Sequence, residues 1–158
     1  MTDNDVVVVD RNCHKSIEQG LMLTGAKPVY MVPSRNRYGI IGPIYPQEMQ
    51  PETLQKKISE SPLTKDKAGQ KPSYCVVTNC TYDGVCYNAK EAQDLLEKTS
   101  DRLHFDEAWY GYARFNPIYA DHYAMRGEPG DHNGPTVFAT HSTHKLLNAL
   151  SQASYIHV

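Results

Sequence analysis

The sequence has no excess of either charge and no long apolar run. Its 158 residues include 16 Lys and Arg against 18 Asp and Glu, which gives a formal net charge of -2. This balance argues against a basic surface for nucleic acid or for an anionic membrane. No apolar segment approaches the ~20 residues of a membrane-spanning helix, and the acidic residues 1–5 are unlike a secretory or transit peptide. We therefore expect a cytoplasmic protein that binds neither nucleic acid nor membrane.

Cysteine is scarce, and its spacing disfavours two common uses. The four cysteines stand at positions 13, 75, 80 and 86, and none forms a C-x-x-C pair. This spacing argues against zinc ribbons and thioredoxin-like redox sites. His141 and His144 are three residues apart, but no third ligand follows at a suitable spacing, so we expect no metal site. We interpret the cysteines as reduced structural residues, in keeping with a reducing compartment.

Short apolar runs alternate with helical patterns along the chain. Residues 5–10 form a β-branched run bounded by aspartates, which is typical of a strand buried on both faces of a parallel sheet. Similar runs occupy residues 28–32, 73–78, 102–106, 136–140 and 154–158, and helical patterns occupy 14–24, 50–59 and 89–98. This alternation predicts an α/β fold with a mostly parallel sheet flanked by helices.

Both ends of the sequence resemble cut edges of a larger fold. The chain opens almost directly on a buried strand, and residues 154–158 have the pattern of a central parallel strand with nothing after it. Such a strand leaves its sheet incompletely covered. We expect residues 1–158 to be part of one larger domain that is truncated at both ends.

Polar residues stand at the carboxyl ends of four predicted strands. Asp10, Thr78, Asp106 and Thr140 occupy these ends or lie close to them. In open α/β sheets, ligands bind beyond the carboxyl ends of the strands. The segments that follow these four residues are therefore expected to converge on one crevice.

Lys145 and Asp106 are the most informative pair in this crevice. Lys145 follows the strand 136–140 and begins an apolar stretch, and Asp106 closes the strand 102–106. Pyridoxal phosphate (PLP) enzymes need such a pair, because the lysine forms a Schiff base with the cofactor aldehyde and the carboxylate holds the pyridine nitrogen protonated. Taken singly, Lys145 could be an exposed lysine that opens a helix, and Asp106 could be a helix N-cap.

The neighbours of Lys145 suit a phosphate group. Ser142, Thr143 and His144 offer hydroxyl and imidazole donors next to backbone N–H groups. Ordinary turn chemistry explains serine and threonine at these positions equally well. His14 follows the first strand, where its imidazole could lie flat on a planar cofactor or cap the next helix. The sequence leaves both alternatives open.

Four sequence blocks together resemble one enzyme family. They are Asp10-Arg-Asn-Cys-His-Lys-Ser16, Thr78-Asn-Cys-Thr-Tyr-Asp-Gly84, His104-Phe-Asp-Glu-Ala-Trp109 and Ser142-Thr-His-Lys145. In this order they are similar to the acid-inducible bacterial decarboxylases of basic amino acids, which are PLP enzymes of the aspartate-aminotransferase fold. The resemblance implies that the chain is the core of a PLP-binding large domain. It also implies a homodimer that assembles further into a decamer.

The resemblance assigns a role to each matching residue. It implies that Lys145 forms the Schiff base, that Asp106 pairs with the pyridine nitrogen and that His14 stacks on the ring, these three being the catalytic residues. The remaining cofactor contacts that it implies are Ser142 and His144 at the phosphate, Trp109 near the cofactor and Thr81 at the ring hydroxyl. In the family, a Gly-Thr-Ser type turn that binds the phosphate precedes the strand corresponding to residues 5–10, and this turn is absent from the sequence.

The sequence between the blocks looks most similar to that of the biodegradative arginine enzymes of the family. The implied reaction is the decarboxylation of L-arginine to agmatine and CO₂, which consumes a proton and suits a role in acid resistance. Two alternatives stay open. The substrate could be lysine or ornithine, or the chain could be a truncated piece that serves only in assembly.

Overall fold

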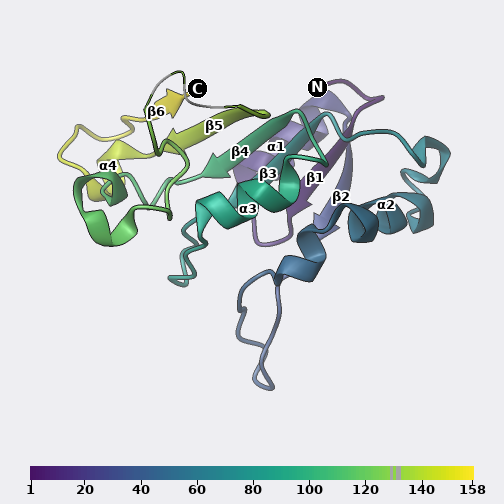
Figure 1. Cartoon of the computed structure of the whole chain (residues 1–158), viewed down its shortest axis with the longest axis horizontal. Coiled ribbons are helices and arrows are strands. Elements are labelled where there is room, and N and C mark those ends of the chain that lie inside the picture. The colour runs from purple at the N-terminus through teal and green to yellow at the C-terminus, as the bar shows by residue number, and fades with distance from the viewer. Residues whose placement is uncertain (129, 131–132) are drawn as a thin grey trace.

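The centre of the fold is a six-stranded sheet. The computed structural model describes residues 1–128, 130 and 133–158. The strand order is β2-β1-β3-β4-β5-β6, with β1 (Val6–Asp10), β2 (Lys27–Met31), β3 (Tyr74–Thr78), β4 (Arg102–Asp106), β5 (Thr136–His141) and β6 (Tyr155–His157). The first five strands are parallel, and β6 is antiparallel to β5. The prediction of an α/β fold with a mostly parallel sheet is confirmed (Figure 1).

The main helices cover both faces of this sheet. They are α1 (Lys15–Thr24) on one face and α2 (Pro51–Glu60) and α3 (Ala89–Leu96) on the other (Figure 1). Their bounds agree with the predicted helical patterns to within two residues. Proline stands in the first turn of α2, and Asn88 caps α3 by accepting from the N–H of Glu91. Within the described ranges, no helix is long and apolar enough to cross a membrane.

The first strand explains why both faces are covered. Val6, Val7, Val8 and Val9 are all buried. Alternate residues of a strand point to opposite faces. Val7 and Val9 accordingly belong to the apolar cluster that contains Leu21 of α1, and Val8 belongs to the cluster that contains Leu54 of α2.

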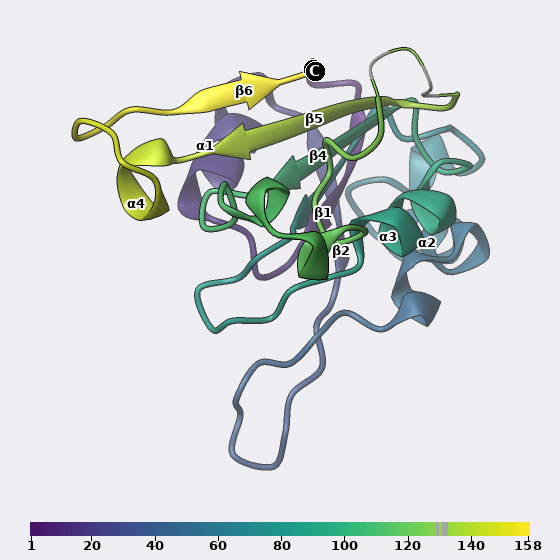
Figure 2. The same ribbon diagram turned by 60° about the vertical axis from the view of Figure 1, so that its left-hand side comes forward.

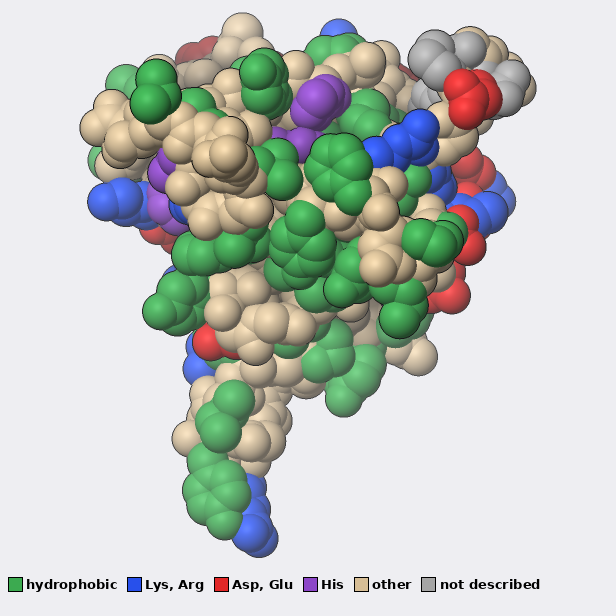
Figure 3. All heavy atoms as spheres, turned by 90° about the vertical axis from the view of Figure 1, so that its left-hand side faces the viewer, with side chains coloured by type: hydrophobic (Ala, Val, Ile, Leu, Met, Phe, Trp, Pro, Cys, Tyr) green, Lys and Arg blue, Asp and Glu red, His purple; other side chains and the backbone are tan. Residues whose placement is uncertain are grey.

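A long arm, residues 33–45, leaves the body between β2 and the 3₁₀ turn η1 (Pro46–Met49). Its two limbs are joined by the hydrogen bonds of Ser34 N–H to the Pro43 carbonyl and of Gly42 N–H to the Ser34 carbonyl, at 2.9 and 2.8 Å. Tyr38 and Ile40 are exposed near its tip. Figure 3 shows the arm standing clear of the body. Three further 3₁₀ turns, η2 (Lys65–Lys67), η3 (Ala113–Phe115) and η4 (Pro117–Tyr119), lie in the connections.

The last strand differs from the prediction. The sequence predicts a central parallel strand at residues 154–158, but β6 is an antiparallel edge strand, and all three of its residues are exposed. The preceding helix, α4 (Thr143–Leu146), is a single turn that ends where the apolar stretch was expected to continue it. A parallel return needs a crossover that is usually a full helix. Because this connection supplies only one turn, the chain folds back beside β5.

Candidate active site

One cavity of about 600 Å³ lies at the carboxyl ends of the parallel strands. Its lining includes Asn12, Cys13 and His14 after β1, Thr78 of β3, Asp106 of β4, Thr140 of β5, Lys145 of α4, and Tyr155 and Ile156 of β6. Figure 2 shows the arrowheads of β4 and β5 pointing toward α4, whose Lys145 lines the cavity. The crevice thus lies where the topology predicts it. Its volume falls in the ordinary range of small-molecule sites, roughly 300–1,000 Å³.

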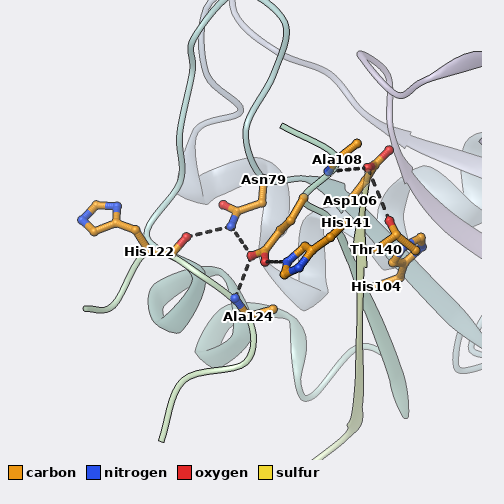
Figure 4. A network of polar contacts seen from close by, with 9 residues as sticks. Asn79, His104, Asp106, Ala108, His122, Ala124, Thr140 and His141 are labelled. Carbon is orange, nitrogen blue, oxygen red and sulfur yellow. Dashed lines mark hydrogen bonds and ion pairs between the residues drawn. The ribbon is translucent and has the colours of Figure 1, made fainter. Parts of the chain in front are cut away.

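Asp106 is buried at the end of β4 with one carboxylate oxygen already engaged. Its Oδ1 accepts from the N–H of Ala108 at 3.2 Å and from the hydroxyl of Thr140 at 3.4 Å (Figure 4). Within the described residues, Oδ2 has no hydrogen-bond donor. No α-helix follows directly, so Asp106 caps only a turn. A buried carboxylate needs a polar partner, and the second oxygen is therefore available to a ligand.

His104 sits behind this carboxylate and fixes Thr140. Its Nε2 lies 3.0 Å from Thr140 Oγ1, and its buried Nδ1 has no partner within the described residues. Burial lowers the pKa of His104 below its ordinary value, so the ring is neutral at pH 7. Since the Thr140 hydroxyl donates to Asp106, the His104 Nε2–H must be the donor to Thr140. This chain of hydrogen bonds orients the Asp106 carboxylate (Figure 4).

Lys145 reaches the cavity beside the one tryptophan. Its Nζ lies 4.8 Å from the centroid of the Trp109 ring, and both residues line the cavity. The Tyr82 ring meets Trp109 edge-on at 5.7 Å between centroids. Lys145 makes no ion pair with any described residue, so its amine is held by the aromatic face and remains available for chemistry.

The loop after β1 places His14 at the same cavity. Asp10 is buried and accepts from the N–H groups of Asn12, at 2.7 Å, and Thr78, at 3.2 Å, which ties the loop to β3. Burial raises the pKa of Asp10 above its ordinary value in spite of these bonds. His14 then caps α1, because its Nδ1 accepts from the Ser16 N–H at 3.3 Å. The capping alternative is therefore realised, and the same ring also lines the cavity.

The three remaining predicted contacts divide into one residue that lines the cavity and two that do not. Ser142 lines it, and the Ser142 hydroxyl makes no capping bond to α4. His144 is exposed, with its Nδ1 2.8 Å from the Ala153 carbonyl oxygen. Thr81 is buried in the turn after β3, where its Oγ1 accepts from the Val85 N–H at 3.1 Å. Neither His144 nor Thr81 is part of the cavity lining.

Sequence reasoning missed a buried polar network around Glu107. This fully buried carboxylate accepts from Asn79 Nδ2 at 2.6 Å, the Ala124 N–H at 2.7 Å and His141 Nε2 at 2.9 Å (Figure 4). His141 lines the cavity, so the network connects the cavity wall to the interior. The acid pair Asp106-Glu107 directly after a buried strand was the available signal, because two adjacent buried carboxylates each require donors.

The donor set of the cavity fits PLP. A buried carboxylate with one open oxygen suits a protonated pyridine nitrogen, and an amine without an ion pair suits an aldehyde. Asp106 and Lys145 both line this cavity and supply these two groups. The Ser142 hydroxyl, which makes no capping bond to α4, suits a phosphate, and the imidazole of His14 offers a planar surface.

Comparison with known proteins identifies relatives over the whole chain. The profile of the family "Orn/Lys/Arg decarboxylase, major domain" matches residues 1–158. Lysine decarboxylase LdcA of Pseudomonas aeruginosa is 52% identical over 154 residues, which cover 98% of this chain and 20% of that protein. The inducible lysine decarboxylase of Escherichia coli K12 is 44% identical, covering 96% of this chain and 20% of its own length. The chain spans about a fifth of the length of the curated relatives it matches.

Solved structures resemble this chain over nearly its whole length. Lysine decarboxylase A from Pseudomonas aeruginosa superposes with a TM-score of 0.88 at 51% identity, over 99% of this chain and 21% of that one. Mouse CSAD superposes with a TM-score of 0.63 at 19% identity, over 96% of this chain and 28% of that one, which shows a shared fold alone.

The expectation of an arginine enzyme is not supported. The two curated relatives at 52% and 44% identity are lysine decarboxylases. The constitutive ornithine decarboxylase of Escherichia coli K12 is 37% identical over 99% of this chain and 22% of its own length. The alternative of lysine or ornithine therefore fits better. The four sequence blocks contain no residue assigned to the distal end of a substrate, so they do not discriminate among basic amino acids. Together, the profile match and these relatives show that the chain belongs to the Orn/Lys/Arg decarboxylase family.

Proposed function

We propose that the native protein carrying this chain is a cytoplasmic, PLP-dependent lysine decarboxylase, and that residues 1–158 form part of its PLP-binding large domain. The observation that carries the proposal is the presence of the Lys145 amine and the open Asp106 oxygen on the walls of one cavity. Lysine as the substrate rests on relatives that are lysine decarboxylases at 52% and 44% identity, against 37% for an ornithine decarboxylase.

Two residues perform the central tasks. When bound, PLP supplies an aldehyde that takes up amines and a cationic ring that accepts the electron pair left by departing CO₂. Asp106 Oδ2 would accept the hydrogen bond of the ring N–H and keep that proton in place, while Thr140 and the Ala108 N–H hold Oδ1. Lys145 Nζ, which lines the same cavity, would be the amine that holds the aldehyde.

The other proposed contacts position the cofactor. His14 would stack on the ring and the Ser142 hydroxyl would donate to the phosphate, while Trp109 bounds the space around the Lys145 amine. His144 is also proposed at the phosphate, which requires it to release the Ala153 carbonyl. Thr81 is proposed at the ring hydroxyl. To reach it, the Thr81 hydroxyl would have to give up the hydrogen bond that it accepts from the Val85 N–H.

The net reaction converts lysine and one proton into a five-carbon diamine and CO₂. Because each turnover consumes a proton, the reaction raises the pH of its surroundings, which supports a role in acid resistance. In keeping with the family resemblance, we propose that the native protein is a homodimer that assembles into a decamer. Light scattering measures the mass of the native assembly and therefore the number of its subunits.

A labelling experiment tests the cofactor site. The native protein is mixed with PLP, reduced with borohydride and mapped by peptide mass spectrometry. We expect the label on Lys145 and its loss in Lys145→Arg. Lys15 also lines the cavity, so Lys15→Arg is the matched control and should keep the label. A label on Lys15, or no label on any lysine of this chain, would contradict the proposal.

Substrate choice is tested by competition. The protein is given equimolar lysine, ornithine and arginine, and the three amine products are quantified. Lysine should give the largest kcat/KM. A preference for ornithine would contradict lysine as the substrate but not the proposed cofactor site, since an ornithine decarboxylase is also among the relatives.

A further inference from the structure

Two cysteines face each other across the hairpin that follows β3. Cys80 and Cys86 form an antiparallel bridge, and their Sγ atoms are 3.4 Å apart without a covalent bond. The hairpin is closed by its own hydrogen bonds, from the Thr81 N–H to the Val85 carbonyl at 2.9 Å and from the Tyr87 N–H to the Asn79 carbonyl at 3.2 Å. These bonds flank the cysteine pair and hold its register.

This register suits a disulfide. The two flanking bonds make Cys80 and Cys86 a non-hydrogen-bonded pair, the type in which the Cα atoms approach to about 4.5 Å and side chains are closest. That separation lies within the range of about 4.4–6.8 Å that disulfides require. Bond formation brings the sulfurs from 3.4 Å to about 2.05 Å, which side-chain rotation can supply.

The two thiols differ in their surroundings. Cys86 is exposed, while Cys80 is buried and lines the cavity. Burial and the contact with Cys86 raise the pKa of Cys80 to about 12. Thiolates are the reactive form, so an oxidant in solution meets the Cys86 sulfur first, and Cys80 serves as the adjacent resolving thiol.

We propose that Cys80 and Cys86 are a reversible oxidation site, which forms a disulfide at the edge of the cavity when the protein meets a peroxide. The Cys86 thiol loses its proton, the thiolate attacks a peroxide oxygen and the O–O bond breaks. The departing hydroxide (for hydrogen peroxide) takes up the proton that the thiol released, so a sulfenic acid and one water result. The Cys80 sulfur then attacks the Cys86 sulfur, the S–O bond breaks, and the Cys80 proton leaves with the hydroxide as a second water. Two thiols are oxidised by two electrons and one peroxide is reduced. A dithiol reverses the reaction.

The site is placed to affect the cavity. The hairpin between the two cysteines carries Tyr82 and Asp83, which line the cavity, and Tyr82 contacts Trp109 edge-on. A covalent link across the base of the hairpin restricts these residues.

Peptide mapping tests the proposal on the native protein. The protein is treated with hydrogen peroxide, free thiols are alkylated, and the chain is cleaved on the N-terminal side of Asp83, which separates Cys80 from Cys86. We expect the two peptides to remain linked after oxidation and to separate after treatment with dithiothreitol. In Cys80→Ser, Cys86 should instead proceed to sulfinic acid or another terminal product, and in Cys86→Ser no link should form.

Cys13 provides the matched control, because it also lines the cavity and is partly buried. Cys13→Ser should leave the linked peptides unchanged. The proposal is overturned if oxidised Cys86 accumulates in the unsubstituted protein while Cys80 stays alkylatable, if either cysteine links to Cys13 instead, or if both thiols remain reduced when other thiols of the protein are oxidised.

Discussion

Glu107 and His141 face each other across the ends of β4 and β5, with 2.9 Å between Glu107 Oε2 and His141 Nε2. Glu107 is completely buried, whereas His141 is 15% exposed and lines the cavity. The other oxygen of Glu107 accepts from Asn79 and from the backbone of Ala124. One carboxylate therefore joins the end of β3, the loop around Ala124 and the wall of the cavity. This network makes the cavity wall part of the rigid interior.

Glu107→Gln tests this network. The substitution keeps the shape, but the amide nitrogen must replace one acceptor oxygen. It then opposes the donors of Asn79 and Ala124, or it forces the His141 imidazole into the tautomer in which Nε2 accepts. We expect the local opening free energy of β4 and β5 to fall by about 1–3 kcal/mol. Amide hydrogen exchange on the native protein measures it. The control Glu52→Gln, at an exposed position in α2, should change it by less than about 0.5 kcal/mol. Equal protection in both variants would refute the role of Glu107.

Much of the fold is predictable because its signals are local. The run at residues 6–9 is apolar on both faces, and the acids and hydroxyls that follow the strands mark one edge of the sheet. The parallel topology then brings Asp106 and Lys145 to one cavity. The prediction for β6 failed because its direction depends on the length of α4, which the apolar pattern at residues 146–150 overstates.

The polar network was not predictable in the same way. The donors to Glu107 come from Asn79, Ala124 and His141, which lie 28, 17 and 34 residues from it in the sequence. The orientations of Thr81 and His144 likewise depend on single backbone partners, Val85 and Ala153. No periodicity in the sequence encodes such contacts. The sequence can therefore place a residue near the crevice without revealing whether its side chain lines the cavity.

Thr140 should influence cofactor binding through Asp106. Thr140→Val removes the hydroxyl that donates to Asp106 and leaves the buried Nε2 of His104 without an acceptor. We expect PLP to bind about tenfold more weakly, which corresponds to the loss of roughly one hydrogen bond. Thr140→Ser restores the hydroxyl and should restore the affinity. Fluorescence titration with PLP gives both dissociation constants, and failure of the serine variant to recover would show that packing, not the hydroxyl, is responsible.

Asp106→Asn should abolish most of the activity while leaving the fold intact. An amide oxygen accepts a hydrogen bond but carries no charge to keep the pyridine nitrogen protonated. We expect the rate of lysine decarboxylation to fall by about 10²–10³-fold. Asp94→Asn is the matched control, since Asp94 pairs with Lys90 on an exposed face of α3. CO₂ release measures both rates, and equal rates in the two variants would remove Asp106 from the proposed mechanism.

Glu48 makes stability depend on acid pH. Its Oε2 accepts from Lys57 Nζ at 2.5 Å and from the Val32 N–H at 2.8 Å. Burial raises the pKa of Glu48, but these hydrogen bonds and the positive charge of Lys57 together outweigh burial, so the pKa lies below its ordinary value. The folded protein therefore binds this proton less readily than the unfolded chain does. The resulting stability is present above the unfolded pKa of about 4.3 and is lost as the pH falls through the lower folded value.

Glu48→Gln should remove this part of the pH dependence. The unfolding midpoint of the native protein, followed by circular dichroism from pH 7 to pH 3, should fall less steeply in this variant than in the unsubstituted protein, because the amide does not titrate. Glu60→Gln breaks the ion pair between Glu60 and Lys56, whose side chains are 63% and 72% exposed, respectively. Because exposed ion pairs contribute little to stability, this variant should leave the steepness of the pH profile unchanged. If Glu60→Gln flattens the profile as much as Glu48→Gln does, the dependence arises from surface charge in general and not from the pair of Glu48 and Lys57.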